Sequence, residues 1–311
     1  MGSLSYHCLL LYVLYVLSNC DASFNFPARL SVAKLSPRAE KRTICGKKGI
    51  DYTSPSVEDI QKGDLIKEIF ELTGHTGGMK GGWKKVKDKQ GAKVWRRKVD
   101  WTPWMQIRTH GIVEASPDFM LELLLDNSRV GEYDSLFDGI DVVERPDDHT
   151  VVRHMLYKAI WPTSPRDFIT YTTHNHLVKG KKNSGWVIAS KSVVHPARPA
   201  TRKRCRGTIY HFGYTLKPAP LADGRTGTEV RMCAHMDLAG GMPASIINFL
   251  SSSQPLGVMH RLQEIATREG VGKPRPMAAA AAQSGALAAF AAPSWKACRK
   301  HLLDNRCVWH C

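Results

Sequence analysis

The feature that most limits the fold is a long amphipathic helix predicted near the carboxyl end, over residues 243–267. Its apolar residues recur every three or four positions and so form one stripe. Pro243 suits the first turn, where no backbone donor is needed, and Pro255 and Gly257 predict a kink in the middle. Such a helix needs an apolar surface to cover. The stripe comprises Ile246, Phe249, Leu250, Leu256, Met259, Leu262, Ile265 and Ala266.

Strands must supply that surface, because strand-like runs fill most of the preceding sequence. A helix through residues 57–72, capped by Ser54 or Ser56, comes first, and short helices are expected after Ser116 and from Arg129. Turns of the hairpin type separate the strands, which predicts antiparallel pairing. The result is an α+β fold in which a strongly curved antiparallel sheet wraps one helix, with a tunnel or a filled core between them. The expected strands are 83–88, 93–99, 105–113, 140–144, 151–159, 167–178, 185–194, 207–217 and 229–238.

The ends of the chain differ in composition from this domain, which we place at residues 54–268. Residues 1–23 resemble a signal peptide without a basic start, 24–53 form a basic linker, and 269–311 form a low-complexity tail rich in Ala and Pro. A cleaved leader predicts the secretory pathway. An uncleaved one predicts a cytoplasmic protein that associates peripherally with membranes. No apolar run reaches the roughly 20 residues that span a bilayer.

The net charge of +16 favours an anionic partner. No RNA-binding pattern of interleaved basic and aromatic residues is present, so nucleic acid is not expected as a partner. A basic loop carries Arg202, Lys203, Arg204 and Arg206. Each basic residue near an anionic membrane surface contributes about 1 kcal/mol, so the loop is a candidate docking segment, with a merely solvated loop as the alternative. The chain is expected to be a monomer.

Catalytic and metal-binding patterns are not evident. The sequence contains no Gly-x-Ser-x-Gly, His-Glu-x-x-His or Cys-x-x-Cys run. His174 and His176 share a strand face but lack a third ligand, and the spacing of Cys and His in the tail fits no zinc module known to us. We therefore expect neither an enzyme nor a bound metal or cofactor.

Two motifs identify a family resemblance. The run at residues 161–168, Trp-Pro-Thr-Ser-Pro-Arg-Asp-Phe, resembles the Trp-Pro-x-Ser-x-Arg-Asp-Phe/Tyr signature of START domains, the steroidogenic acute regulatory protein-related lipid-transfer modules. Residues 237–243, Asp-Leu-Ala-Gly-Gly-Met-Pro, resemble the family's Asp-x-x-Gly-x-x-Pro before its last helix. The resemblance implies a helix-grip fold that holds one lipid in a tunnel, with the helix and a nearby loop as a lid.

Within the family, the sequence is closer to the phosphatidylcholine and ceramide transfer branch than to the sterol branch. Phe168 and Tyr214 match two positions of the aromatic cage that holds choline in the phosphatidylcholine transfer protein, and Met155 replaces its Trp. Asp134 matches an acid near the ligand. Arg129 lies one residue out of register with the arginine that pairs with lipid phosphate.

Other positions of the expected tunnel favour phospholipid over ceramide. Ser190 stands where ceramide transfer has Asn. Arg153 shares a strand face with Met155 and Tyr157, so it either enters the tunnel, where a buried cation needs a phosphate or a carboxylate such as Asp134, or lies at an exposed edge. Arg166 could contact lipid or form a salt bridge with Asp167.

The lid helix brings Phe249, Leu250 and Met259 to the same region, where core packing and tunnel lining are compatible roles. The sequence therefore predicts a carrier that transfers one phospholipid, such as phosphatidylcholine, between membranes. The alternatives are a lipid-sensing interaction module and a ceramide or sterol carrier.

Overall fold

The computed structural model describes residues 54–75, 81–178, 180–181 and 184–269. The predictions of a signal peptide, a basic linker and a low-complexity tail fall outside these residues. The Cys and His residues of the tail fall outside them as well.

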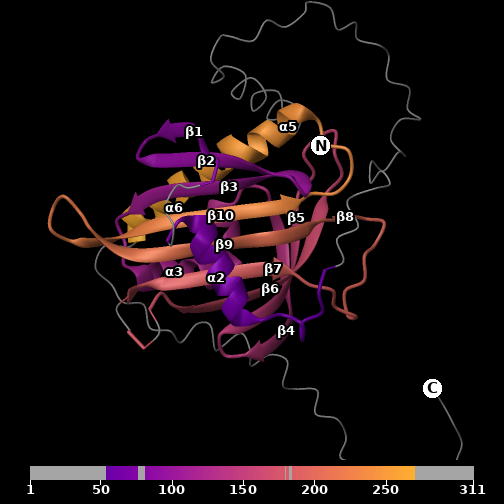
Figure 1. Cartoon of the computed structure of the whole chain (residues 1–311), viewed down its shortest axis with the longest axis horizontal. Coiled ribbons are helices and arrows are strands. Elements are labelled where there is room, and N and C mark those ends of the chain that lie inside the picture. Colours follow the sequence, from indigo (N-terminus) through magenta and orange to yellow (C-terminus); the bar gives the residue numbers. More distant parts are fainter. Residues whose placement is uncertain (1–53, 76–80, 179, 182–183, 270–311) are drawn as a thin grey trace, which may run out of the picture. The chain divides into compact units, whose positions relative to one another are not determined.

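The described residues form one antiparallel sheet with the strand order β1-β2-β3-β10-β9-β7-β6-β5-β4 (Figure 1). A two-residue strand, β8, pairs in parallel with β6 off this path and was missed by the sequence analysis. The strands are β1 (Lys84–Lys89), β2 (Ala92–Val99), β3 (Thr102–Val113), β4 (Phe137–Asp147), β5 (Thr150–Tyr157), β6 (Arg166–His176), β7 (Trp186–Ser192), β8 (Cys205–Arg206), β9 (Thr208–Pro220) and β10 (Thr226–Asp237).

Helices lie on both faces of the sheet. On one face, α6 shares a hydrophobic core with buried residues such as Ile188 of β7, while α2 shares the other core with Val187 and Ala189, which point the opposite way from the same strand. The sequence predicted that the carboxyl-terminal helix covers one face of the sheet, but it did not predict that α2 covers the opposite face. The helical segments are α2 (Lys62–Thr73), α3 (Pro117–Leu125), η2 (Asn127–Arg129), α4 (Val130–Tyr133), α5 (Ala244–Asn248), η4 (Phe249–Ser253) and α6 (Gln254–Glu269).

Local signals placed several boundaries correctly. Gln90 and Gly91 take φ values of 51° and 75°, as the predicted tight hairpin turn between β1 and β2 requires. Ser116 caps α3, because its side chain accepts a hydrogen bond from the backbone of Phe119. The predicted cap of the first helix was wrong, since α2 begins only after Gln61.

The carboxyl-terminal helix is continuous in sequence but changes its winding. Five residues, Phe249–Ser253, form a π-helical turn between α5 and α6. Pro255 follows directly; it donates no backbone hydrogen bond, and its ring would press on the carbonyl of Ser251 in a regular helix. A wider turn relieves both problems. The irregularity therefore lies one turn before the predicted kink.

Candidate functional site

A cavity of ≈ 200 Å³ lies between the concave face of the sheet and the carboxyl-terminal helix. This volume counts space for the centres of water molecules, and one water needs about 10–15 Å³ on that measure, so the region is hollow. The residues that line it are mostly apolar. They include Met105, Ile107, Met155, Phe168, Ile188, Phe212, Tyr214, Met232 and Met236 from the strands, Ile247, Leu250, Gln254 and Val258 from the helix, and Ile160, Thr163 and Met242 from loops.

Arg153 of β5 brings a positive charge to this apolar wall. Its side chain is buried, and Nη2 donates to the carbonyl of Leu125 at 3.1 Å. Its Nε has no hydrogen-bond partner, and no carboxylate among the described residues pairs with the guanidinium. Burial lowers the pKa of Arg153 to about 10, so the group still carries its charge near neutral pH. A buried cation without an anion suits a negatively charged ligand group.

Asp134, at the end of α4, also lines the cavity but forms no ion pair with Arg153. Its Oδ1 accepts hydrogen bonds from the backbone of Leu136 at 3.0 Å and from the side chain of Gln254 at the start of α6 at 3.1 Å. Gln254 was not predicted as a cavity residue, because helical periodicity identifies the apolar residues of a helix and not the polar residues between them. The contact joins α4 to the helix that closes the cavity.

Burial raises the pKa of Asp134, so its charged form is disfavoured in the folded protein. This cost is absent below the unfolded pKa of about 3.9 and grows as pH rises through the higher folded value. We therefore expect Asp134→Asn, which keeps the Oδ1 acceptor, to raise the free energy of unfolding at neutral pH and to leave it unchanged near pH 3. Urea unfolding at both pH values measures this. A loss of stability at neutral pH would contradict it.

The two aromatic residues proposed for headgroup binding both lie in the cavity wall. Phe168 meets Tyr157 edge-on at 5.6 Å between ring centroids, and Tyr214 meets Phe212 in the same way at 5.4 Å. Met155 is directly opposite Phe168 across β5 and β6. The structure thus brings the three predicted cage positions to one chamber.

Ser190 and Arg166 line the cavity with polar groups that already have partners. The Ser190 hydroxyl lies 2.9 Å from that of Thr172. Arg166 donates to the carbonyls of Ser164, Leu238 and Ala239, and so clamps the connection that leads to α5. The alternative of a salt bridge between Arg166 and its neighbour in sequence was wrong.

Three predicted contacts lie outside the cavity lining. Arg129 pairs with Glu132 at 2.8 Å and with Glu269 at 2.9 Å, which ties η2 and α4 to the end of α6. Phe249 is half-buried on the helix but does not line the cavity. Met259 is fully buried against β3, where a Cβ added to Gly111 would lie 2.8 Å from its Cγ. Met259 therefore anchors the helix to the sheet.

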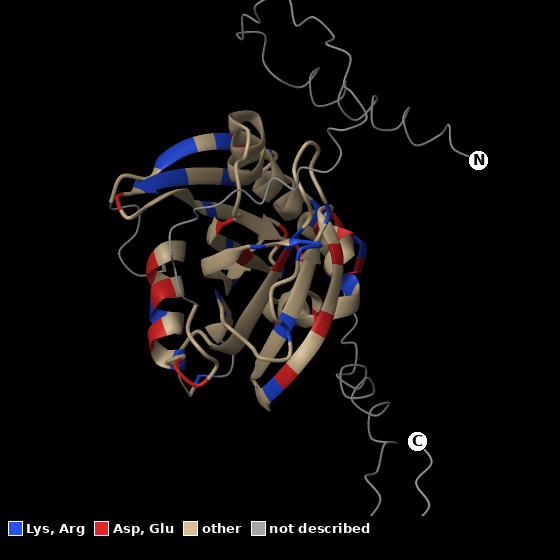
Figure 2. Ribbon diagram, turned by 90° about the vertical axis from the view of Figure 1, so that its right-hand side faces the viewer, with Lys and Arg blue, Asp and Glu red and all other residues tan. Residues whose placement is uncertain are grey.

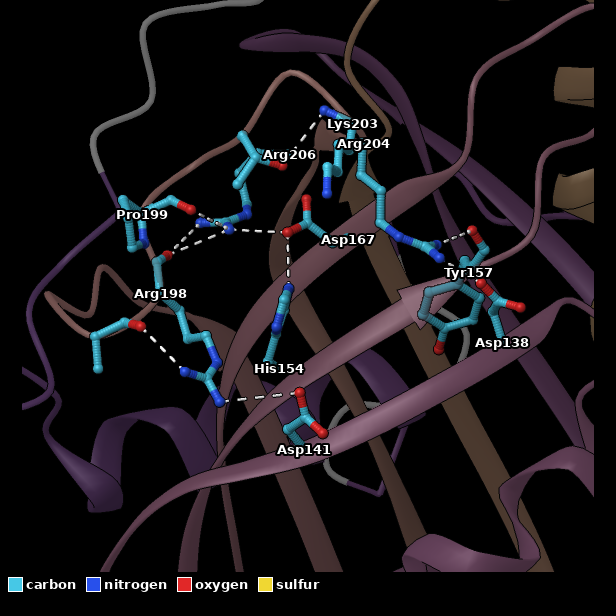
Figure 3. Close-up of polar contacts among 12 residues, drawn as sticks. Asp138, Asp141, His154, Tyr157, Asp167, Arg198, Pro199, Lys203, Arg204 and Arg206 are labelled. Atoms are coloured by element: carbon cyan, nitrogen blue, oxygen red, sulfur yellow. Dashed lines mark hydrogen bonds and ion pairs between the residues drawn. The ribbon is translucent and has the colours of Figure 1, made fainter.

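The predicted docking loop is partly tied to the sheet (Figure 3). Arg206 Nη2 pairs with Asp167 Oδ2 at 2.8 Å, and His154 Nε2 lies 2.8 Å from the same oxygen. Burial by itself raises the pKa of Asp167, but the hydrogen bonds from Arg206 and His154 outweigh burial and hold the pKa below its usual range. Arg206 thus stabilises a buried carboxylate.

Arg204 also pairs with an aspartate of the sheet, whereas Arg202 and Lys203, which precede it, are exposed. Its Nη2 pairs with Asp138 of β4 at 2.5 Å, and its Nη1 donates to the carbonyl of Tyr157 at 3.0 Å. Arg202 and Lys203 are exposed and belong to no ion pair within the described residues. Only these two of the four predicted docking residues project freely.

A curved antiparallel sheet that closes an apolar cavity with its last helix defines a helix-grip ligand-binding protein. The sequence model of the START domain matches residues 67–267, more than half of the chain, and the chain belongs to this family. Family membership supports lipid binding and transfer in general, and nothing in the described residues shows catalysis.

Similar structures and proteins agree on the fold. Human StAR-related lipid transfer protein 5 superposes with a TM-score of 0.58 at 19% identity, over 66% of this chain and 96% of that one. Human STARD10 gives a TM-score of 0.57 at 18% identity, over 73% and 84%. Mouse and human StAR-related lipid transfer protein 7, mitochondrial, are 23% identical over 175 residues. This match covers 52% of the chain and spans about half, 46%, of those relatives.

Membrane-spanning helices and clusters of metal ligands are both absent from the described residues. None of their helices has the length and apolar composition that a membrane span requires. No group of three or more His, Cys, Asp or Glu residues gathers among them in a way that could hold a metal ion.

Proposed function

We propose that this chain binds one phospholipid in the cavity and transfers it between membranes. The observation that carries the proposal is the buried guanidinium of Arg153, which lines a mostly apolar chamber and has no carboxylate partner among the described residues. A lipid phosphate would supply the missing anion, and acyl chains would fill the apolar remainder. Each buried CH₂ group contributes about 0.8 kcal/mol, which is ample to hold a long chain out of water.

Phosphatidylcholine is the favoured species. Phe168 and Tyr214 line the same chamber as Arg153, and both offer aromatic faces that attract a quaternary ammonium. Met155 adds a polarizable contact in place of a third ring. Ceramide has no phosphate, so it would leave Arg153 unpaired.

Lipid extraction from the purified full-length chain, followed by native mass spectrometry, tests the proposal. We expect one phosphate-containing lipid per protein. A sterol or ceramide as the bound species, or an empty protein, would refute it. Transfer between donor and acceptor vesicles then separates a carrier from the lipid-sensing alternative, because a sensor binds lipid without delivering it.

The choline contact has its own test. We expect Tyr214→Leu to lower transfer of phosphatidylcholine about 30-fold while transfer of phosphatidic acid, which lacks choline, changes little, because a desolvated cation–π contact contributes about 2 kcal/mol. The matched control is Tyr171→Leu, a buried tyrosine on the opposite face of the sheet. An equal loss for both lipids in the Tyr214 variant would remove the aromatic cage from the proposal.

A further inference from the structure

We infer that the β1–β2 hairpin, residues 83–99, is the surface by which this protein docks on an anionic membrane. The inference rests on the proposed function, because it assigns a membrane-facing side to the proposed carrier. It concerns a segment that the sequence analysis treated only as a hairpin.

The hairpin concentrates positive charge on an exposed edge. It carries a net charge of +7 out of +16 for the whole chain, and Asp88 is its single acid. Figure 2 shows Lys and Arg along much of the two strands that form this edge. Six of its basic side chains are exposed, namely Lys84, Lys85, Lys87, Lys89, Lys93 and Lys98.

These charges are mostly not neutralised by the protein itself. Within the described residues, the hairpin forms one ion pair, Lys85 with Asp88 at 2.7 Å. The loop at residues 195–206 differs, since Arg198, Arg204 and Arg206 each pair with an aspartate of the sheet. The hairpin therefore offers more free positive charge to an external partner than that loop does.

Strand register places three of the lysines on the side where the lid helix packs. Lys84, Lys87 and Lys89 stand opposite Arg96, Val94 and Ala92, and directly paired residues point to the same face. Val94 and Ala92 belong to the core beneath α6.

Hydrogen bonds then join the hairpin to the helix that closes the cavity. Arg96 Nη1 lies 3.2 Å from Asn248 Oδ1 and 3.1 Å from Ser251 Oγ, and Ser251 lines the cavity. Further along, His260 Nε2 lies 3.1 Å from the carbonyl of Lys89. A bilayer that contacts the hairpin therefore lies beside α5 and η4, where a lipid would enter or leave.

The aromatic residues of the hairpin favour a membrane over a nucleic acid. The guanidinium groups of Arg97 and Arg108 lie over the ring of Trp83, 4.7 and 4.3 Å from its centroid. Trp95 stacks on His110 at 6.4 Å. Single-stranded nucleic acids bind basic surfaces through free aromatic faces, and both tryptophans of the hairpin already contact other side chains of the protein through their rings.

The test compares the full-length natural protein with the triple variant Lys84→Glu, Lys87→Glu and Lys89→Glu in a vesicle flotation assay. The vesicles are phosphatidylcholine with or without phosphatidylserine. One basic residue near an anionic surface contributes about five-fold in partitioning, so we expect the variant to bind phosphatidylserine vesicles roughly 100-fold more weakly. Binding of the natural protein should also weaken with added salt.

The control variant has the same change in net charge on other elements: Lys67→Glu on α2, Arg145→Glu on β4 and Lys217→Glu on β9, all exposed. We expect it to retain most of the binding. Equal losses of binding in both triple variants, or unchanged binding of the hairpin variant, would overturn the inference. The remaining role of the lysines would then be to keep the edge strand β1 from pairing with strands of other chains. Native mass spectrometry of each variant reports lipid occupancy separately, so an empty cavity would count against the proposed function and not against the docking surface.

Discussion

Replacing Arg153 by methionine should lower phospholipid occupancy about 10- to 100-fold while the free energy of unfolding stays the same or rises. The guanidinium is buried without a carboxylate partner, so an apolar side chain of similar length removes a desolvation cost. Its proposed bond to lipid phosphate is charge-assisted and contributes about 1.5–3 kcal/mol, which sets the size of the loss. Urea unfolding of delipidated protein and quantitative native mass spectrometry measure the two quantities.

Arg166→Met is the matched control, because Arg166 also lines the cavity but donates to three backbone carbonyls. We expect this variant to lose stability, since buried acceptors are left unpaired. Full phospholipid occupancy in the Arg153 variant would show that its guanidinium does not hold the headgroup. An unfolded Arg153 variant would show that the contact with the carbonyl of Leu125 is its main role.

Replacing Met259 by alanine should lower the free energy of unfolding by about 3 kcal/mol, because large-to-small changes in a packed core lose contacts and leave a void. Met259 is 1% exposed and fills the space above Gly111. For a domain of this size the loss corresponds to a fall in Tm of about 6–12 °C. Since Met259 does not line the cavity, the species of bound lipid should not change.

Leu250→Ala provides the comparison, because Leu250 is half-buried on the same helix and lines the cavity. Leu250→Ala should lower the free energy of unfolding less than Met259→Ala does, and it should lower the fraction of protein that carries lipid more. Differential scanning calorimetry and lipid identification on both variants check the contrast. A changed lipid preference in the Met259 variant without a lower Tm would contradict this and would show that Met259 contacts the lipid.

The parts of the fold that follow local rules were predictable from the sequence. Alternating apolar residues marked most strands, Gln90-Gly91 marked the tight hairpin turn, and the order of elements together with two motifs indicated the helix-grip arrangement. The cavity positions of Met155 and Tyr214 followed from the resemblance, whereas strand periodicity left Arg153 open between the cavity, where it lies, and an exposed edge. Each of these depends on residues close in sequence or on a face fixed by strand periodicity.

The errors concern partners that come from far along the chain. Arg129 meets Glu269, 140 residues away, and Arg204 meets Asp138, 66 residues away. Periodicity says which side chains share a face, but it does not say which distant carboxylate reaches them. The same limit hid the contact between Gln254 and Asp134.

The π-helical turn has a consequence for lipid exchange. It separates the five residues of α5 from α6, which Met259 fixes to the sheet. Opening the chamber at this seam would displace only α5 and the turn, while most of the apolar stripe stays packed. Substitutions at residues 244–253 are therefore expected to change the rate at which lipid enters and leaves, with a smaller loss of melting temperature than substitutions of the buried residues of α6.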